Sequence, residues 1–266
     1  MSIVLDRAEF FALAALFKAD EIIGLDTAVL LPDDVSARQA LYDIGRAQLL
    51  ARDLLRVEPD GSVAIDEGLS TLFTPLASPE TAVLALRHVP EHGRQVFLYY
   101  ERAGRYVEQT LPDESTHRLE SIGDRTALIE RLLTIYPINA SGFVPEALTV
   151  PASPMGRAFR LVEDGQTAEA RALLEAATPA EATLAGYMVD LLESAQFSGS
   201  ITLARPQPGK VARSIDIVVV QAPDEAWGFI PTSDTSLLNA ERMNRAVLRQ
   251  TLEHILTLLG FAEPER

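Results

Sequence analysis

The sequence predicts an α+β fold of two quasi-symmetric halves, in which helices pack around a central antiparallel β-sheet. Several short runs alternate apolar and polar residues with the period of a β-strand. Other runs have helical periodicity and begin at capping residues. A pattern of two or three strands followed by a helix in residues 83–132 returns in residues 201–252. A recurrence of this length indicates two domain-scale halves, not a solenoid of short units.

The recurrence consists of similar residues at nearly constant spacing. The matches are Val83, Ala85 and Arg87 with Ile201, Leu203 and Arg205, residues 96–100 with 215–219, Tyr106 with Trp227, Pro112 with Pro231, and Arg125, Leu128 and Leu132 with Arg245, Leu248 and Leu252. Two unrelated hairpin-and-helix units are the alternative, because apolar alternation also recurs by chance. We expect an N-terminal half at residues 1–136, a proline-containing connector at 137–165 and a C-terminal half at 166–266, within one compact domain.

Composition excludes several classes of function. The 266 residues are 47% apolar, enough for a full core, and include no cysteine. Disulfide scaffolds, thiolate catalysis and cysteine-based zinc sites are therefore excluded. A net charge of −15 and the presence of only two lysines, Lys18 and Lys210, disfavour binding to nucleic acid or anionic membranes. The first residues do not resemble a signal peptide and the apolar runs are too short to span a bilayer, so we expect a cytoplasmic protein without membrane insertion.

The N-terminal region is expected to be mainly helical. Asp6 and Glu9 have capping-box spacing ahead of a helix whose apolar stripe includes Phe10 and Phe17. This helix has no cationic face, so packing on the core is favoured over membrane binding. The elements that follow are a short strand at 25–31, a turn at 32–34, a helix at 37–55 capped by Ser36 with Gln39, a hairpin at 57–63 around Asp60-Gly61, and a helix at 66–76.

Two sharper functions for this region are disfavoured. Asp33 and Asp34 could bind a metal ion, but no further ligand stands at a defined spacing, and a solvated turn explains them better. The order helix, hairpin, helix is also typical of winged-helix DNA-binding domains. These helices carry too few cations for that use.

The first sheet unit has apolar residues on both faces of its strands. Val96, Leu98 and Tyr100 share one face, and Phe97 and Tyr99 share the other. Both faces are therefore expected to be covered. The aromatic residues are interpreted as core, because a base-stacking platform would need basic neighbours. A helix capped by Asp124 follows, and then the connector, in which Pro137, Pro145, Pro151 and Pro154 interrupt the periodicity around a short helix at 155–161.

The C-terminal half is expected to repeat the arrangement. Its clearest helix start is Thr178-Pro179-Ala180-Glu181, with a cap and a proline at the first helical position. The expected elements are helices at 167–176 and from 178 to about 195, strands at 201–205, 214–221 and near 227–230, turns at 206–209 and 232–236, and a closing helix at 239–259 ended by Gly260.

No catalytic, cofactor-binding or metal-binding residue can be assigned. His88 and His92 lie at a strand end and a turn, where helical metal-site geometry fails. There is no Gly-x-Ser-x-Gly elbow or phosphate-binding loop, and residues 198–200 are expected to be a turn. The acidic pairs Glu163-Asp164 and Asp224-Glu225 are expected to be solvated. Arg87 and Arg205, equivalent in the repeat, either have structural positions, which we favour, or mark a pseudo-symmetric groove.

The ordered series of elements resembles the EspG family of type VII (ESX) secretion-associated proteins over almost the whole chain. The resemblance includes the early amphipathic helix, the sequence AQLLARDL at 47–54 before the hairpin, the helix at 69–76, Leu84-Ala85-Leu86-Arg87, Phe143-Val144-Pro145, Gln196-Phe197-Ser198-Gly199, the strand at 215–220, Trp227 and the final helix. Each motif is diffuse, and their order is more specific than any single one.

The resemblance implies two quasi-symmetric halves around a central antiparallel sheet. It also implies a non-enzymatic cytosolic chaperone or adaptor, without cofactors, that keeps helical secreted proteins of the PE–PPE or WXG100 type soluble. The family has no catalytic motif to transfer, and its partner contacts lie in variable loops, so no partner-binding residue is assigned.

Two other functions stay open. The chain could be an enzyme or small-molecule binder with a pocket between the halves. It could also be a structural or regulatory module, and unpaired sheet edges would permit a homodimer in every case.

Overall fold

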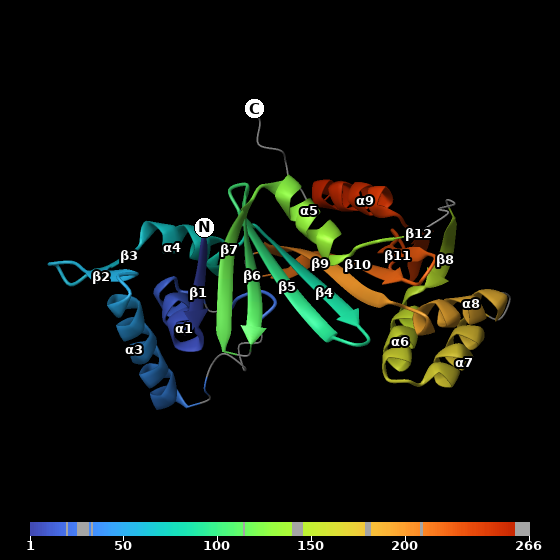
Figure 1. Ribbon diagram of the computed structural model, residues 1–266, viewed down its shortest axis with the longest axis horizontal. Helices are drawn as coiled ribbons and strands as arrows, with labels where there is room; N and C mark the ends of the chain where they lie inside the picture. The colour runs from blue at the N-terminus through green and yellow to red at the C-terminus, as the bar shows by residue number, and fades with distance from the viewer. Residues whose placement is uncertain are drawn as a thin grey trace.

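The chain forms one ten-stranded antiparallel sheet with helices on both faces (Figure 1). The computed structural model describes residues 1–19, 21–25, 32, 34–113, 115–139, 146–178, 182–207 and 210–258. The strand order is β1-β7-β6-β5-β4-β9-β10-β11-β12-β8, and a two-stranded hairpin, β2–β3, stands apart from the sheet. This architecture confirms the predicted α+β class with a large antiparallel sheet and helices around it.

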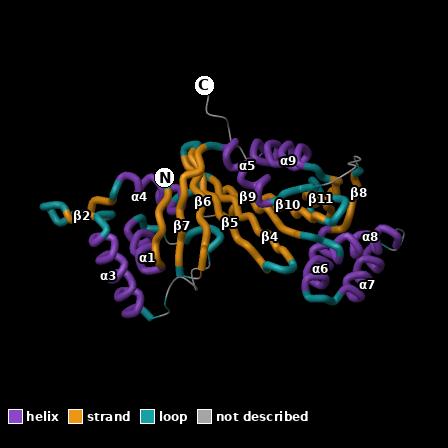
Figure 2. Tube along the Cα trace, in the orientation of Figure 1, coloured by secondary structure: helices purple, strands orange, loops and turns teal. Residues whose placement is uncertain are grey.

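The helices and strands are spread along the whole chain (Figure 2). The strands are β1 (Ser2–Asp6), β2 (Leu55–Val57), β3 (Val63–Ile65), β4 (Thr81–Val89), β5 (Gly93–Arg102), β6 (Arg105–Asp113), β7 (Thr116–Gly123), β8 (Ala147–Pro151), β9 (Phe197–Gln207), β10 (Lys210–Gln221), β11 (Ala226–Pro231) and β12 (Leu237–Arg242). The described helices are α1 (Arg7–Leu16), α3 (Val35–Ala51), α4 (Glu67–Ala77), α5 (Arg125–Ile135), α6 (Ala152–Glu163), α7 (Thr167–Ala177), α8 (Ala182–Glu193) and α9 (Arg245–Leu258).

The strand order is the same when read outward from the central pair, β4 and β9. One side continues through β5, β6 and β7 to β1, and the other continues through β10, β11 and β12 to β8. In the central pair, Val83 lies opposite Leu203 and Ala85 opposite Ile201. The sequence match pairs the same four residues the other way, Val83 with Ile201 and Ala85 with Leu203. A local two-fold axis near Leu84 would relate the two strands in this manner. We interpret the order as an internal repeat whose second copy begins at β8.

The strand matches next to the central pair are one residue out of register. Tyr99 pairs with Val83, and Ile217 pairs with Ile201. The counterpart of Tyr99 is therefore Ile217, whereas the sequence match placed Val218 there. Because side chains alternate between faces, a one-residue error moves a residue to the opposite face. The match of Tyr106 with Trp227 fails for the same reason, since these side chains belong to cores on opposite faces.

Three cores hold the helices to the sheet. On one face, α5 and α9 pack over the middle strands, with Leu128 and Leu248 fully buried in a core that spans β4 and β9. On the other face, α1, α3 and α4 cover one end of the sheet around Phe73. The helices α6, α7 and α8 cover the other end around Trp227. Both faces of β5 are therefore covered, as its two apolar faces predicted.

Helix starts are predicted well where the cap is local. The Asp6–Glu9 capping box is present, with each side chain accepting a hydrogen bond from the other residue's backbone N–H. Asp124 also caps α5 as predicted. The predicted Ser36 cap is wrong, because Asp34 accepts from the Ala37 N–H and α3 begins two residues earlier.

Short strands were missed where a helical pattern overlapped them. Leu237–Arg242 forms β12, so the predicted start of the closing helix at residue 239 is wrong. The predicted connector contributes the edge strand β8 and the helix α6. Residues 198–200 lie within β9 and do not form the expected turn. Predictions made for residues 26–31, Asp33, residues 143–145, residues 179–181, residues 208–209 and Gly260 fall outside the described residues.

A glycine sets the approach of α1 to α3. A Cβ at Gly45 would lie 1.9 Å from the backbone oxygen of Ala8, whereas a Cβ at Gly156 in α6 would meet no heavy atom within 4 Å. We expect Gly45→Ala to reduce the free energy of unfolding by about 1–3 kcal/mol through overpacking. Gly156→Ala should raise it by up to ~1 kcal/mol through helix propensity. Urea denaturation measures both, and equal effects would contradict the close helix crossing.

A buried histidine makes stability depend on pH. His117 in β7 is 2% exposed, stacks on Phe10 at 3.9 Å and accepts a hydrogen bond from the Gln109 amide at Nδ1, while its Nε2 has no partner. Burial lowers the pKa of His117 from 6.5 to about 4. The unfolded state therefore takes up the proton at higher pH than the native state, and stability is lost as pH falls between these values.

We expect the wild-type protein to lose about 3 kcal/mol more stability than His117→Gln between pH 6.5 and pH 4. Urea denaturation at the two pH values gives this difference, and it is independent of any constant effect of the substitution on stability. Equal losses in the two proteins would exclude His117 as the cause.

Candidate functional site

None of the described helices covers the middle of the sheet on the face that carries the two outer helix groups. We call this surface the central sheet face and define it by six residues from adjacent positions on β4, β9 and β10, namely Leu84, Leu86, Ser200, Thr202, Asp216 and Val218. All six retain solvent exposure. The groups α1–α3–α4 and α6–α7–α8 stand at the two ends of the sheet, with β4 and β9 between them (Figure 1).

The chemistry of this face is an aliphatic strip beside a polar one. Leu84 and Leu86 lie side by side on β4 and are half-buried. Opposite them on β9, the Thr202 hydroxyl donates a hydrogen bond of 2.5 Å to the exposed carboxylate of Asp216. Such a surface can bind an apolar segment along the strip and hydrogen-bond its polar edge.

Tyr136 supports the central sheet face from the opposite side of the sheet. Its hydroxyl lies 2.8 Å from the backbone oxygens of Leu86 and Ser200, one on each central strand. Gly199 leaves room for the ring, because a Cβ there would lie 2.7 Å from Tyr136 Cε1 and 2.2 Å from the Leu86 oxygen. Burial raises the pKa of the Tyr136 hydroxyl, which therefore stays protonated and able to donate. This contact bridges the two central strands and stabilises their pairing.

The C-terminal wall of the central sheet face is anchored by one carboxylate. Glu225 accepts hydrogen bonds from Tyr187 at 2.6 Å and from Trp227 Nε1 at 3.0 Å, and it forms an ion pair with Arg242 at 2.8 Å. The guanidinium of Arg242 also lies 5.4 Å from the centre of the Trp227 ring. The expectation that Glu225 is solvated is therefore wrong. The cluster ties α8 to β11 and β12 and fixes the position of this wall.

The N-terminal wall has a comparable buried carboxylate. Glu9 in α1 is 3% exposed, and both of its carboxylate oxygens lie 2.7 Å from one guanidinium nitrogen of Arg52. The same carboxylate completes the capping box of α1. One side chain thus caps α1 and holds the end of α3 against it.

The predicted candidate residues do not converge. Arg87 is half-buried with its guanidinium 5.0 Å from the centre of the Phe197 ring, and Arg205 is exposed near the opposite end of the central pair. This placement favours the structural interpretation of Arg87. In the described part of the chain, His, Asp and Glu form no group of three that could hold a metal ion.

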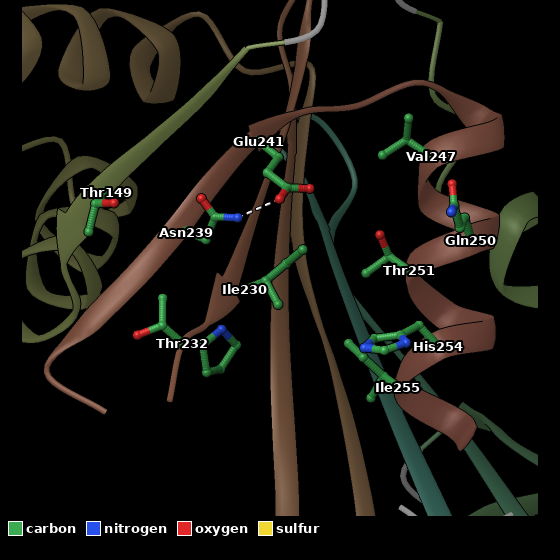
Figure 3. A pocket seen from close by; sticks show the side chains of 11 residues that line it. Thr149, Ile230, Thr232, Asn239, Glu241, Val247, Gln250, Thr251, His254 and Ile255 are labelled. Carbon is green, nitrogen blue, oxygen red and sulfur yellow. Dashed lines mark hydrogen bonds between the residues drawn. The ribbon is translucent and has the colours of Figure 1, made fainter. Parts of the chain in front are cut away.

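The interface between the halves is filled. Val83, Ala85, Ile201 and Leu203 are buried there in a single core. These buried residues leave no space for a ligand on this face, and the hypothesis of a ligand pocket between the halves stays a prediction. A pocket of about 660 Å³ lies instead within the C-terminal half, between α9 and the strands β11, β12 and β8 (Figure 3).

Sequence reasoning missed this pocket because its floor includes β12, which was predicted as helix. The alternation of Leu238 and Ala240, both in the core, with Asn239 and Glu241 on the pocket side was the available signal. A separate finding concerns membranes: none of the helices in the described ranges is long and apolar enough to cross a bilayer.

Comparisons with known proteins establish the fold. No protein-family model matches the sequence, and no curated protein matches it either. Among solved structures, the chain is similar to EspG5, a type VII secretion system chaperone of Mycobacterium tuberculosis whose structure was solved in complex with a PE25–PPE41 dimer. The match covers 99% of each chain with a TM-score of 0.64 and 13% sequence identity. The protein therefore has an EspG-like fold.

Proposed function

We propose that this protein is a non-enzymatic cytoplasmic chaperone of the EspG family, which binds a helical secretion substrate and keeps it soluble. The observation that carries the proposal is the similarity to EspG5 over the full length of both chains. Similarity of a single sheet or helix pair would carry much less, since one fold can serve many functions. The substrate class is a PE–PPE-like or WXG100-like helical protein.

The central sheet face is the surface that suits such a substrate. A helical hairpin with an exposed apolar tip aggregates unless the tip is covered before export. The half-buried strip of Leu84 and Leu86 can cover it, while the helix groups at the two ends limit its orientation. A helix or helical tip in a groove is a common mode of peptide recognition. Tyr136 holds the floor in place, so little ordering of the chaperone accompanies binding.

A ligand-binding or regulatory module that forms a homo-oligomer is the alternative function. Its support is that, among the described strands, β1 and β8 lie at the ends of the strand order and each pair with a single neighbour. The mass of the isolated protein in solution gives its oligomeric state. A monomer would remove the support for the alternative, whereas a homodimer is compatible with both functions.

The proposal is tested by co-expression of the full chain with helical secretion pairs from its source organism. We expect a stable complex with at least one pair in size-exclusion chromatography with light scattering. Thr202→Arg, on the central sheet face, should weaken that complex at least tenfold, because it places a long cation where the apolar tip must pack. Failure of every pair to bind the folded chain would exclude the chaperone function.

The matched control is Thr134→Arg. Thr134 is exposed on α5, on the opposite face of the sheet, so the same substitution there should leave affinity unchanged. Thermal denaturation checks that both variants are folded. A complex that tolerates Thr202→Arg would move the binding surface elsewhere and leave the chaperone function intact.

A further inference from the structure

We propose that the pocket beside α9 binds an alkylguanidinium group, such as an arginine side chain or a free arginine derivative. The pocket has a volume of about 660 Å³, within the range of small-ligand sites. Thr251 and His254 project from α9 toward the strands, and Ile230, Asn239 and Glu241 face them from the sheet (Figure 3). The inference does not depend on the proposed chaperone function.

The N-terminal half contains a guanidinium in the corresponding place. Arg131 of α5 reaches down to the sheet, where it lies 3.7 Å from Glu108 on β6 and 3.3 Å from Glu120 on β7. Tyr99 donates a hydrogen bond of 2.8 Å to Glu108 from the neighbouring strand. One partly exposed cation from the helix thus pairs with carboxylates on the outer strands of its own half.

In the C-terminal half, the residue at that helix position is Thr251. Arg131 and Thr251 each lie six residues after the arginine that begins the helix, Arg125 in α5 and Arg245 in α9. Both helices belong to the same core on the same face of the sheet. The replacement of arginine by threonine removes the internal cation, and the space it would occupy is part of the pocket.

The strand positions correspond in the same way. Glu108 lies opposite Glu120, and Ile230 lies opposite Asn239, on the second and third strands outward from the central pair in each half. The C-terminal carboxylate is Glu241, two residues from Asn239 on β12 and on the same face. The pocket therefore retains an anionic wall while the internal cation is missing.

Glu241 is available to an external cation. Within the described residues its carboxylate accepts a hydrogen bond from the Asn239 amide and has no ion-pair partner. The nearby arginines are engaged elsewhere: Arg242 with Glu225 and Glu146, and Arg245 and Arg249 with Glu130. The apolar side chains of Ile230, Val247 and Ile255 line the rest of the pocket and suit an alkyl stem. An arginine-like group combines such a stem with a planar cationic head.

The first test is isothermal titration of the full chain with n-butylguanidinium and with the neutral isostere n-butylurea. We expect saturable binding of the cation at least tenfold tighter than the urea, since charge-assisted hydrogen bonds are the stronger ones. The substitution Glu241→Gln should weaken the binding of n-butylguanidinium at least tenfold. The matched control, Glu253→Gln on an exposed part of α9, should leave it unchanged. Equal binding of cation and urea, or equal affinity in Glu241→Gln, would overturn the proposal.

A second variant tests the comparison between the halves. Thr251→Arg restores an internal guanidinium, which should abolish n-butylguanidinium binding and raise the melting temperature, because the pocket is then filled from within. Unchanged ligand affinity in folded Thr251→Arg would overturn the proposal.

The source of the group is distinguished by comparing agmatine with an N-acetylated, C-amidated Ala-Arg-Ala peptide. Tighter binding of agmatine supports a small-molecule ligand, and tighter binding of the peptide supports an arginine side chain of a protein. Failure of both to bind would overturn the proposal.

Discussion

The pairing of β4 with β9 joins the two halves, and the other features depend on it. Seven residue pairs in register make the ten strands one sheet, and the core under α5 and α9 is continuous across the seam. Tyr136 fixes the seam by donating toward a backbone oxygen on each strand, and Gly199 is the residue that admits its ring. The open middle of the opposite face exists because this rigid seam carries helices on one side only.

The fold class could be predicted because its signals are local. The capping box at Asp6 and Glu9, the hairpin around Asp60-Gly61 and the alternation at residues 96–100 each need only a few neighbouring residues. Two short strands at one end of the sheet could not be predicted in this way. The edge strand β8 pairs with β12, which is distant from it in the sequence, and β12 is short, so a helical interpretation of residues 239–244 was equally consistent with the local pattern.

The candidate sites were less predictable than the fold. Glu225 looks solvated in a run of turn residues, yet Tyr187 and Arg242, one of them distant and both from other elements, bind it beside Trp227 and partly bury it. Register explains the other failure: a slip of one residue in the sequence match between the two halves placed Trp227 on the wrong face of the sheet. The role of a charged residue in this chain depends on which oppositely charged residues the fold brings near it. That information is long-range: Arg131 finds a carboxylate on β6, a strand not adjacent to α5 in the sequence, whereas Thr251, at the corresponding helix position, lines a pocket.

The antiparallel pairing of β4 with β9 also determines where the chain could be divided into two fragments. A break between α5 and β8 separates two segments, each with its own helices and five strands of the sheet. The strand at the edge of each segment is then a long central strand, β4 or β9. Its hydrogen-bonding edge and the apolar face beside it are complementary to those of the other segment. Two fragments that meet through a single strand pairing have the arrangement that a split reporter requires.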